Sequence, residues 1–148
     1  MPDILLRSAR ESDEKWIKDL IHRVRINPFN LHWEHFIVAE TPQGELIGCG
    51  QLKPHQDGCV EMASLAVEEA YREQGVGRRI IALLILQAPR PLYLMCRPGL
   101  GEYYAKFGFQ TIQHQDFPPY FSRMRRMIQI FTILARHAEP LIMRLDNP

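Results

Sequence analysis

The sequence has little cysteine and almost no net charge. Its three cysteines, Cys49, Cys59 and Cys96, are widely spaced and form no C-x-x-C pair. Neither a zinc site nor a disulfide framework is therefore expected, and the cysteines are interpreted as buried free thiols of a reducing, cytoplasmic compartment. Lys and Arg number 18 and Asp and Glu 17, for a net charge of +1. This balance predicts no broad attraction to nucleic acid or to a membrane surface.

Long apolar runs are also missing. The longest, IIALLILQA, lies between Arg79 and Pro89 and is too short to cross a membrane, so we interpret it as a core helix. The first ten residues, MPDILLRSAR, lack the apolar region of a secretion signal. Among the histidines, His32 and His35 are close in sequence, but such a pair is more typical of a structural role than of a metal site. We expect no metal.

The chain of 148 residues is long enough for one buried core and too short for two ordinary domains. Apolar residues make up 46% and charged residues 24%, as in globular proteins. Hydrophobic periodicity and turn residues predict one mixed α/β (α+β) domain over residues 1–148, with a largely antiparallel sheet. The expected strands are 4–10, 35–40, 45–52, 59–67, 91–96, 108–114 and 140–145. The first expected helix begins after a capping Ser12. Three more helices are expected, over 76–87, 99–107 and 120–136.

The most informative stretch is VEEAYREQGVGRR, residues 67–79. An apolar strand runs into a turn with Gly75 and Gly77, and a helix follows. These glycines allow a positive φ and a close approach of a ligand, and the helix directs its unpaired N–H groups and positive dipole end at an anion. Arg72 and Arg78 add charge at the same place. We call residues 72–78 the glycine turn and predict that it binds a pyrophosphate.

Other interpretations of the glycine turn were weighed. A dinucleotide site needs a third glycine where Ile80 stands, and no βαβ unit precedes the turn. A P-loop needs Gly-Lys followed by Ser or Thr, which this turn lacks. A plain strand-to-helix connection that happens to use two glycines stays open on this motif alone.

A second motif, YYAKFGF at residues 103–109, follows about 25 residues later, after the predicted strand PLYLMC. At this point the chain resembles the GNAT superfamily of acyl-CoA-dependent N-acyltransferases. That family has a strand ending in Val, a Q/R-x-x-G-x-G/A turn, a buried helix, a strand and a Y-x-K-x-G-F helix end, in this order. The matching residues here are Val67, Arg72, Gly75, Gly77, Tyr104, Lys106, Gly108 and Phe109. The resemblance implies a three-layer fold, with a mixed, mostly antiparallel sheet flanked by helices.

The resemblance also implies acetyl-CoA as cosubstrate and assigns its contacts. The main chain of Leu65, Ala66 and Val67 would run beside the pantetheine arm and serve the thioester carbonyl. The glycine turn would form the pyrophosphate shell, with Arg72, Glu73, Gln74, Gly75, Val76, Gly77 and Arg78. Apolar side chains at Leu65 and Val67 would be core in any fold, so only their backbone role is implied.

Tyr104 occupies the position of the general acid in many family members. An ordinary phenol, with a pKa near 10, lies about 1.5 units above a thiol near 8.5 and can donate to a thiolate at neutral pH. Tyr103 is the competing candidate, but neighbouring helix residues point about 100° apart, so only one can face the cofactor sulfur. A tyrosine simply packed at a helix end is the alternative.

Glu61 lies where family members often carry a carboxylate that deprotonates the amine, usually through water. Strand alternation predicts that Glu61, Ala63, Leu65 and Val67 share one face unless a bulge intervenes. A carboxylate on an otherwise apolar face is either functional or lies at a wet strand end.

Two features depart from the family. Arg97, followed by Pro98, stands where an asparagine often contacts the cofactor. An insertion at about 118–137 separates the last two strands, and it carries a predicted helix with an apolar stripe and a basic edge. The stripe is Phe121, Met124, Met127, Ile128, Phe131 and Leu134, and the edge is Arg123, Arg125, Arg126 and Arg136. It is either a helix packed on the sheet, or a lid or dimer face beside the acceptor cleft; a membrane-surface helix is a weaker third option.

The sequence therefore predicts an enzyme, an N-acetyltransferase that moves an acetyl group from acetyl-CoA to a primary amine by direct attack in a ternary complex. The alternative is a non-catalytic module that binds acyl-CoA as a sensor or partner domain. The expected partners are acetyl-CoA and an amine acceptor of unspecified class, with no nucleic acid and no membrane. A homodimer is compatible with the family.

Overall fold

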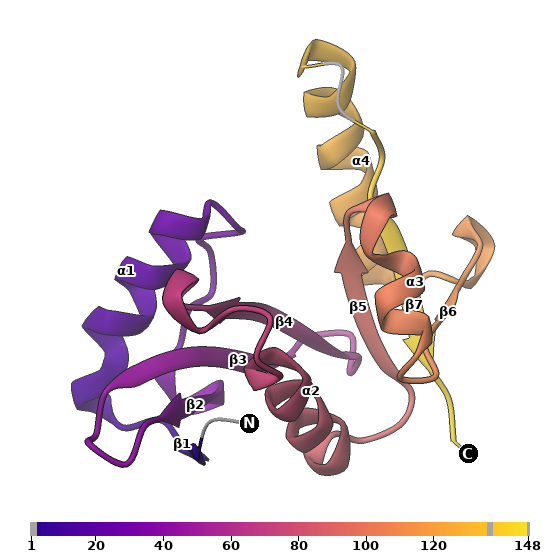
Figure 1. Cartoon of the computed structure of the whole chain (residues 1–148). Helices are drawn as coiled ribbons and strands as arrows, with labels where there is room; N and C mark the ends of the chain where they lie inside the picture. Colours follow the sequence, from indigo (N-terminus) through magenta and orange to yellow (C-terminus); the bar gives the residue numbers. More distant parts are fainter. Residues whose placement is uncertain (1–2, 136–137, 148) are drawn as a thin grey trace. The chain divides into compact units, whose positions relative to one another are not determined.

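A computed structural model describes residues 3–135 and 138–147, and side chains outside 131–137. The chain divides into two compact units, residues 1–53 with 62–88 and residues 54–61 with 89–148. We call them the N-terminal unit and the C-terminal unit. Within the described residues, seven strands form one sheet, in which hydrogen-bonded neighbours have the order β1-β2-β3-β4-β5-β7-β6, and four α-helices accompany them (Figure 1). The mixed, mostly antiparallel sheet with flanking helices confirms the predicted fold class.

The N-terminal unit begins with β1 (Leu5–Ser8), α1 (Glu14–Val24), β2 (Phe36–Glu40) and β3 (Leu46–Pro54). Most of β4 (Val60–Val67) and all of α2 (Val76–Gln87) complete it. β1 pairs with β2 and β2 with β3, both antiparallel, which confirms the hairpin predicted around TPQG. The predicted and observed elements agree to within a few residues, because each apolar run is bounded by turn residues.

The two helices of the N-terminal unit cover opposite faces of its strands. Ile17, Leu20 and Ile21 of α1 pack in one buried cluster with Phe36, Val38 and Cys49. Side chains alternate along a strand, so Gly48 and Gly50 present the other face of β3. A Cβ at Gly50 would lie 2.9 Å from Leu84 Cδ1 of α2. Because both glycines lack a side chain, α2 can lie close to β3.

The start of α1 differs from prediction. Ser12 does not cap it; a 3-10 turn, Glu11–Asp13, precedes the helix, and Asp13 holds the capping position. The Asp13 carboxylate accepts hydrogen bonds from the Arg10 N–H at 2.7 Å and from Arg7 Nη1 at 2.8 Å. Asp13 therefore joins the helix start to β1 and is nearly buried.

Strand β4 does not alternate regularly. Ser64 has a φ of 57°, in the left-handed region that a non-glycine residue seldom adopts. The buried Gln51 donates from Nε2 to Ser64 Oγ at 2.7 Å, and Cys49 Sγ donates to Ser64 O at 3.5 Å. The shared face expected of Glu61, Ala63, Leu65 and Val67 depended on a strand without a bulge, and the irregularity at Ser64 breaks that condition because it shifts the residues after it.

The C-terminal unit contains β5 (Leu92–Cys96), α3 (Gly101–Ala105), β6 (Gln110–Thr111), α4 (Pro119–Ala135) and β7 (Leu141–Leu145). The first residues of β4 belong to it: Val60 pairs with Leu92 and Glu61 with Tyr93, in parallel. β7 pairs antiparallel with β5 on one side and with β6 on the other. The last strand of the chain thus lies inside the sheet, between two earlier strands.

Helix α4, the predicted insertion, packs by its first turn. Phe121 is fully buried in a cluster with Tyr93 and Ile142. Met127, expected on the buried stripe, is instead 57% exposed, and so is Ile130 at 63%. Arg123 and Arg126 are exposed as expected. The side chains of Phe131 and Leu134, and the whole of Arg136, lie outside the described residues. The helix is therefore anchored at Phe121, and its exposed side is more apolar than the pattern indicated.

Candidate functional site

The glycine turn combines a left-handed backbone with the start of a helix. Gly75 immediately precedes α2 with a φ of 84°, and Glu73 has a φ of 63°. The Arg79 N–H donates to Gly75 O at 3.1 Å, which is the first turn of hydrogen bonding in α2. The amides ahead of Arg79 belong to the helix N-terminus, where N–H groups have no intrahelical acceptor. The turn therefore offers main-chain donors to a negatively charged group.

The side chains of the glycine turn divide into two kinds. Arg72, Glu73, Gln74 and Arg78 are exposed, whereas Val76 is 1% exposed and packs in the core. Arg72 Nε donates to Val67 O at 3.1 Å, so its guanidinium is held beside the end of β4. Among the predicted residues, Val76 can contribute its main chain alone. Arg72 and Arg78 are the two whose positive charge is available to an anion.

The start of the turn is tied to α1. Glu68 accepts from Arg23 Nη2 at 2.8 Å and from Trp16 Nε1 at 3.3 Å, both on its Oε1. The hydrogen bond from Arg23, assisted by its charge, lowers the pKa of Glu68. The Glu68 N–H also donates to Ile47 O at 2.8 Å. These contacts fix the point where β4 ends and the glycine turn begins.

The predicted pantetheine contacts lie at the end of β4. Ala66 is buried, and Leu65 and Val67 are half-buried. The parallel register between β4 and β5 ends at Glu61 and Tyr93, so these three residues lie beyond the segment of β4 that pairs with β5. Their position is compatible with the main-chain role that the resemblance implies.

Glu61, the candidate base, forms a buried pair with a residue that the sequence analysis missed. His55 Nε2 lies 2.9 Å from Glu61 Oε1, and the two side chains are 8% and 6% exposed. His55 begins the turn that joins β3 to β4, where the His55 N–H donates to Cys59 O. In an antiparallel hairpin, residues opposite and two positions along share a face. His55, Cys59 and Glu61 therefore lie on one face, which the HQDG turn could have indicated.

The first turn of α4 covers this pair. The Tyr120 ring stacks on the His55 ring, with centroids 3.5 Å apart and planes 14° apart, and Phe121 meets the same ring edge-on at 6.2 Å. The Tyr120 N–H donates to Asp57 Oδ2 at 2.9 Å, which fastens the helix to the turn. The apolar cover explains why the His55–Glu61 pair is nearly dry.

The other titratable groups around the pair keep one protonation state near neutral pH. Burial raises the pKa of Tyr120 to about 12, and the charge of Glu61 adds to it. Burial, with help from Asp57, also raises the pKa of Cys59 to about 12. Burial raises the pKa of Tyr93 too. Burial opposes ionisation of Asp57, but the N–H groups of Tyr120 and Cys59 outweigh it and lower the Asp57 pKa.

Tyr104, the candidate acid, lies on α3 in the C-terminal unit. Its ring is half-buried and meets the rings of Tyr103 and Phe109 edge-on, at 5.2 and 6.3 Å. Burial raises the pKa of Tyr104 to about 12, with smaller contributions from Cys96 and Tyr103. The phenol therefore keeps its proton at every pH at which the protein would work. It is a weaker acid than the ordinary phenol assumed from sequence.

The three cysteines do not fit the role of an acyl carrier. Burial raises the pKa of Cys49 to about 12 and that of Cys96 above its ordinary value, and Cys59 behaves likewise. A thiol becomes a nucleophile as its thiolate, so a raised pKa suppresses that reaction.

Arg97, at the position where the family often has asparagine, is exposed.

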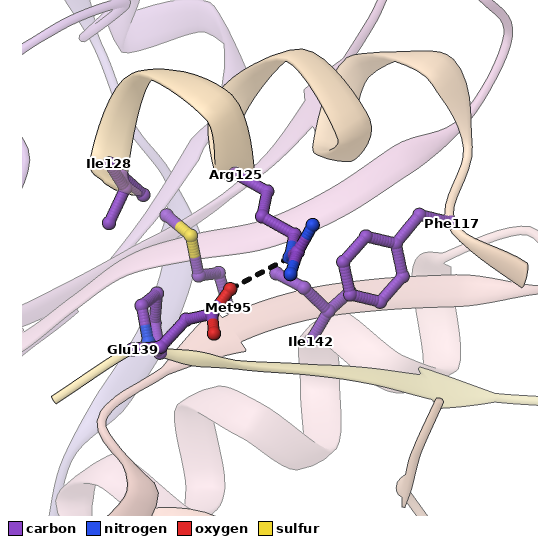
Figure 2. Close-up of a pocket in the computed structure, with 7 residues that line it drawn as sticks. Met95, Phe117, Arg125, Ile128, Glu139 and Ile142 are labelled. Atoms are coloured by element: carbon purple, nitrogen blue, oxygen red, sulfur yellow. Dashed lines mark hydrogen bonds and ion pairs between the residues drawn. The ribbon is translucent and has the colours of Figure 1, made fainter. Parts of the chain in front are cut away.

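A small hollow in the C-terminal unit lies under α4 (Figure 2). It is lined mainly by Met95, Phe117, Ile128 and Ile142, and Arg125 of α4 points across it to Glu139. Arg125 Nε and Glu139 Oε1 are 2.7 Å apart, and this ion pair joins the helix to the segment before β7. The hollow is apolar and small, and we assign it to the packing of α4.

The structure thus places the predicted residues in two groups. The cofactor-binding set, from Leu65 to Arg78, lies in the N-terminal unit, and both catalytic candidates, Glu61 and Tyr104, lie in the C-terminal unit.

Among the residues that the structure describes, no three His, Cys, Asp or Glu side chains gather as a metal site would need. Within the same residues, no helix is both long and apolar enough to pass through a membrane.

Comparison with known proteins gives a family match. Residues 32–111, more than half of the chain, match the family model described as an acetyltransferase (GNAT) domain. The amino-acid acetyltransferases of two Neisseria meningitidis strains are 34% identical to this chain over 104 residues. That alignment covers 67% of this chain and 23% of either relative. The chain therefore spans less than a quarter of the length of these curated relatives.

Solved structures agree on the fold. N-acetylglutamate synthase from Neisseria gonorrhoeae, solved with coenzyme A and N-acetyl-glutamate, superposes with a TM-score of 0.78 at 23% identity. That match covers 99% of this chain and 35% of the synthase. A Mycobacterium tuberculosis protein solved with CoA gives a TM-score of 0.75 at 23% identity, over 97% of this chain and 99% of its own. At this identity the likeness concerns the fold.

Proposed function

Because the chain belongs to the GNAT family of acetyltransferases, we propose that it transfers an acetyl group from acetyl-CoA to the primary amine of an amino acid. The observation that carries the proposal is the backbone of the glycine turn. Gly75 has a φ of 84° immediately before α2, and Arg72 is held beside the end of β4. This backbone supports binding of the CoA pyrophosphate. The amino-acid acceptor is supported by the name of the curated relatives.

We propose direct transfer, without an acyl-enzyme. The raised thiol pKa values support this, since no described cysteine is activated. The amine first gives one proton to Glu61, directly or through water. Its nitrogen lone pair then attacks the thioester carbonyl carbon, a C–N bond forms, and the C–S bond breaks with its electron pair going to sulfur.

Tyr104 is proposed as the donor to the leaving sulfur. A phenol with a pKa of about 12 does not readily protonate a free thiolate, because an ordinary thiol has a pKa near 8.5. Donation is therefore tied to the breaking of the C–S bond, and Tyr104 recovers its proton from the nitrogen of the tetrahedral intermediate. The products are the N-acetyl amine and CoA thiol, and one proton goes to solvent.

The test measures release of CoA thiol from acetyl-CoA across a panel of amino acids, with polyamines and a lysine-containing peptide as other acceptors. Turnover highest on one or more free amino acids supports the proposal. Turnover on other amines alone overturns the acceptor class and keeps the transferase. No turnover on any amine, with acetyl-CoA binding intact by calorimetry, overturns the activity.

The role of Glu61 is tested by Glu61→Gln, which keeps the shape of the side chain and removes the base. We expect a fall in kcat of about a hundredfold or more and a weaker rise of activity with pH. A profile that keeps its height and shape would assign the proton transfer to another group or to water.

A further inference from the structure

The pair formed by His55 and Glu61 has a feature that the proposed function does not use. Glu61 alone would suffice as a base, yet its Oε1 lies 2.9 Å from an imidazole nitrogen that is as deeply buried as the carboxylate. An ionised carboxylate accepts hydrogen bonds and cannot donate them, so His55 Nε2 carries the hydrogen in that state. One carboxylate oxygen is thereby fixed, and Oε2 is left to receive a proton.

The imidazole itself is held on a second side. The Tyr120 ring lies parallel to it at 3.5 Å, and Phe121 closes its edge. The Tyr120 main chain is fastened to Asp57, which lies two residues after His55. The ring therefore has little freedom to turn away from Glu61, and the contacts that restrain it come from α4.

We propose that His55 is a positioning residue for the acetyl transfer: it donates from Nε2 to Glu61 Oε1 and so orients Glu61 to take the proton of the amine on Oε2. This inference rests on the proposed function. When the amine gives up its proton, an N–H bond of the amine breaks and an O–H bond forms at Glu61 Oε2, while His55 Nε2 keeps its hydrogen bonded to Oε1 across the 2.9 Å contact. No bond other than N–H and O–H changes in this step, and the proton leaves to solvent after turnover.

The groups that face the pair each keep one protonation state over the pH range of the experiment. The facing groups are Asp57 and Cys59 on the hairpin, Tyr120 on α4 and Tyr93 on β5. Asp57, with its pKa lowered, stays ionised at pH 6–9, and the three with raised pKa values stay neutral. A change in the pH profile caused by a His55 variant therefore reports on the pair.

The experiment compares two substitutions of His55 in the full chain. His55→Phe keeps a flat ring for stacking on Tyr120 but removes the hydrogen bond. His55→Gln removes the titratable ring but can place an amide N–H near the former Nε2. His114→Phe is the matched control, because His114 is an exposed histidine of the same unit, in edge contact with Phe117. Each variant is measured for kcat and amine KM between pH 6 and 9, for acetyl-CoA affinity and for thermal stability.

We expect His55→Phe to lower kcat about tenfold or more, with amine KM and acetyl-CoA affinity within about threefold of wild type. His55→Gln should recover most of kcat, while the acid limb of the pH profile shifts, because an amide cannot ionise as an imidazole can. His114→Phe should match wild type. A merely structural role of His55 would instead change thermal stability and leave the profile in place.

The inference is overturned if His55→Phe keeps the wild-type kcat and profile, or if His55→Gln is as slow as His55→Phe. Should His55→Phe fail to fold, His55→Gln decides alone: an unshifted acid limb rejects the inference and a shifted limb supports it. A wild-type protein that acetylates no amine rejects the proposed function first, and this result is distinguishable because it appears before any variant is made.

Discussion

Gly48 on β3 lies directly against Ile80 of α2: a Cβ at Gly48 would be 2.9 Å from Ile80 Cδ1 and 3.3 Å from Ala66 O. The backbone oxygen cannot move without disturbing β4, so the contact fixes how near α2 sits to the strands. This relationship predicts a stability effect with a specific rescue.

Gly48→Ala should lower the free energy of unfolding by about 1–3 kcal/mol, because it overpacks a close contact. Ile80→Val removes Cδ1 and by itself costs about 0.5–1.5 kcal/mol. The double variant should lose clearly less unfolding free energy than the sum of the two single losses, since the clash is relieved. Urea unfolding of the four proteins in the cycle measures this. Gly99→Ala, where a Cβ would meet nothing within 4 Å, is the control. Strict additivity would show that the strand, and not Ile80, absorbs the added methyl.

Gly75→Ala should weaken acetyl-CoA binding. Gly75 has a φ of 84°, and a side chain there costs roughly 1–2 kcal/mol unless the turn rearranges and moves the donors of α2. Gly44→Ala is the matched control, because Gly44 has the same φ of 84° in the hairpin between β2 and β3, with nothing within 4 Å of its Cβ position. Both should lose similar stability on heating. We expect calorimetry to find an affinity loss of about tenfold for Gly75→Ala alone; equal affinities would remove Gly75 from the cofactor site.

Tyr104→Phe should keep acetyl-CoA affinity and lower turnover about tenfold or more. Because the pKa of Tyr104 is raised to about 12, its hydroxyl stays protonated throughout pH 7–10. The ratio of wild-type to Tyr104→Phe rates should therefore be constant over that range. Tyr103→Phe is the comparison, and we expect it to retain activity. A ratio that falls toward one as pH rises would mean that the phenol ionises earlier than burial predicts.

Asp13→Asn should make the protein less stable at neutral pH and less sensitive to acid. The hydrogen bond from Arg7 is the largest influence and lowers the pKa of Asp13, against the effect of burial. A carboxylate with a lowered folded-state pKa stabilises the fold above its unfolded pKa near 4, and this stabilisation is lost as pH falls through the folded value. Melting temperatures from pH 7 down to 2.5 should converge for the two proteins at the acid end. If the two melting temperatures kept a constant difference down to pH 2.5, the stabilisation would not come from the ionised Asp13 carboxylate.

Much of the fold could be predicted from local pattern. The helices over 76–87 and 120–136 are found at Val76–Gln87 and Pro119–Ala135, because apolar spacing and proline boundaries act within a few residues. The start of α1 could not be predicted, because Asp13 holds the capping position in place of Ser12 and is bound there by Arg7 of β1. The face of α4 that carries Met127 was assigned wrongly, because helical spacing gives a stripe without saying how much of it is covered.

The candidate site divides in the same way. The left-handed φ of Gly75 could be predicted because the residues of the turn are consecutive, whereas Gly77, expected to be left-handed too, lies inside α2. The binding role of the turn stays a prediction. The partner of Glu61 could not be found by the motif, since His55 belongs to the preceding turn and depends on the hairpin pairing. The burial that raises the pKa of Tyr104 was equally absent from the sequence, because it depends on rings and thiols from neighbouring elements.

Sequence by itself determined the family, the glycine turn and nearly every helix and strand, because glycine, proline and apolar spacing constrain the backbone locally. Tertiary structure decided which side chains lost water and which neighbours they then acquired. In the folded chain β4 is irregular at Ser64, β7 lies between β5 and β6, and the Tyr120 ring stacks on His55 beside Glu61. Acid–base chemistry is set by desolvation and by contacts between distant segments, and these exist once the chain has folded.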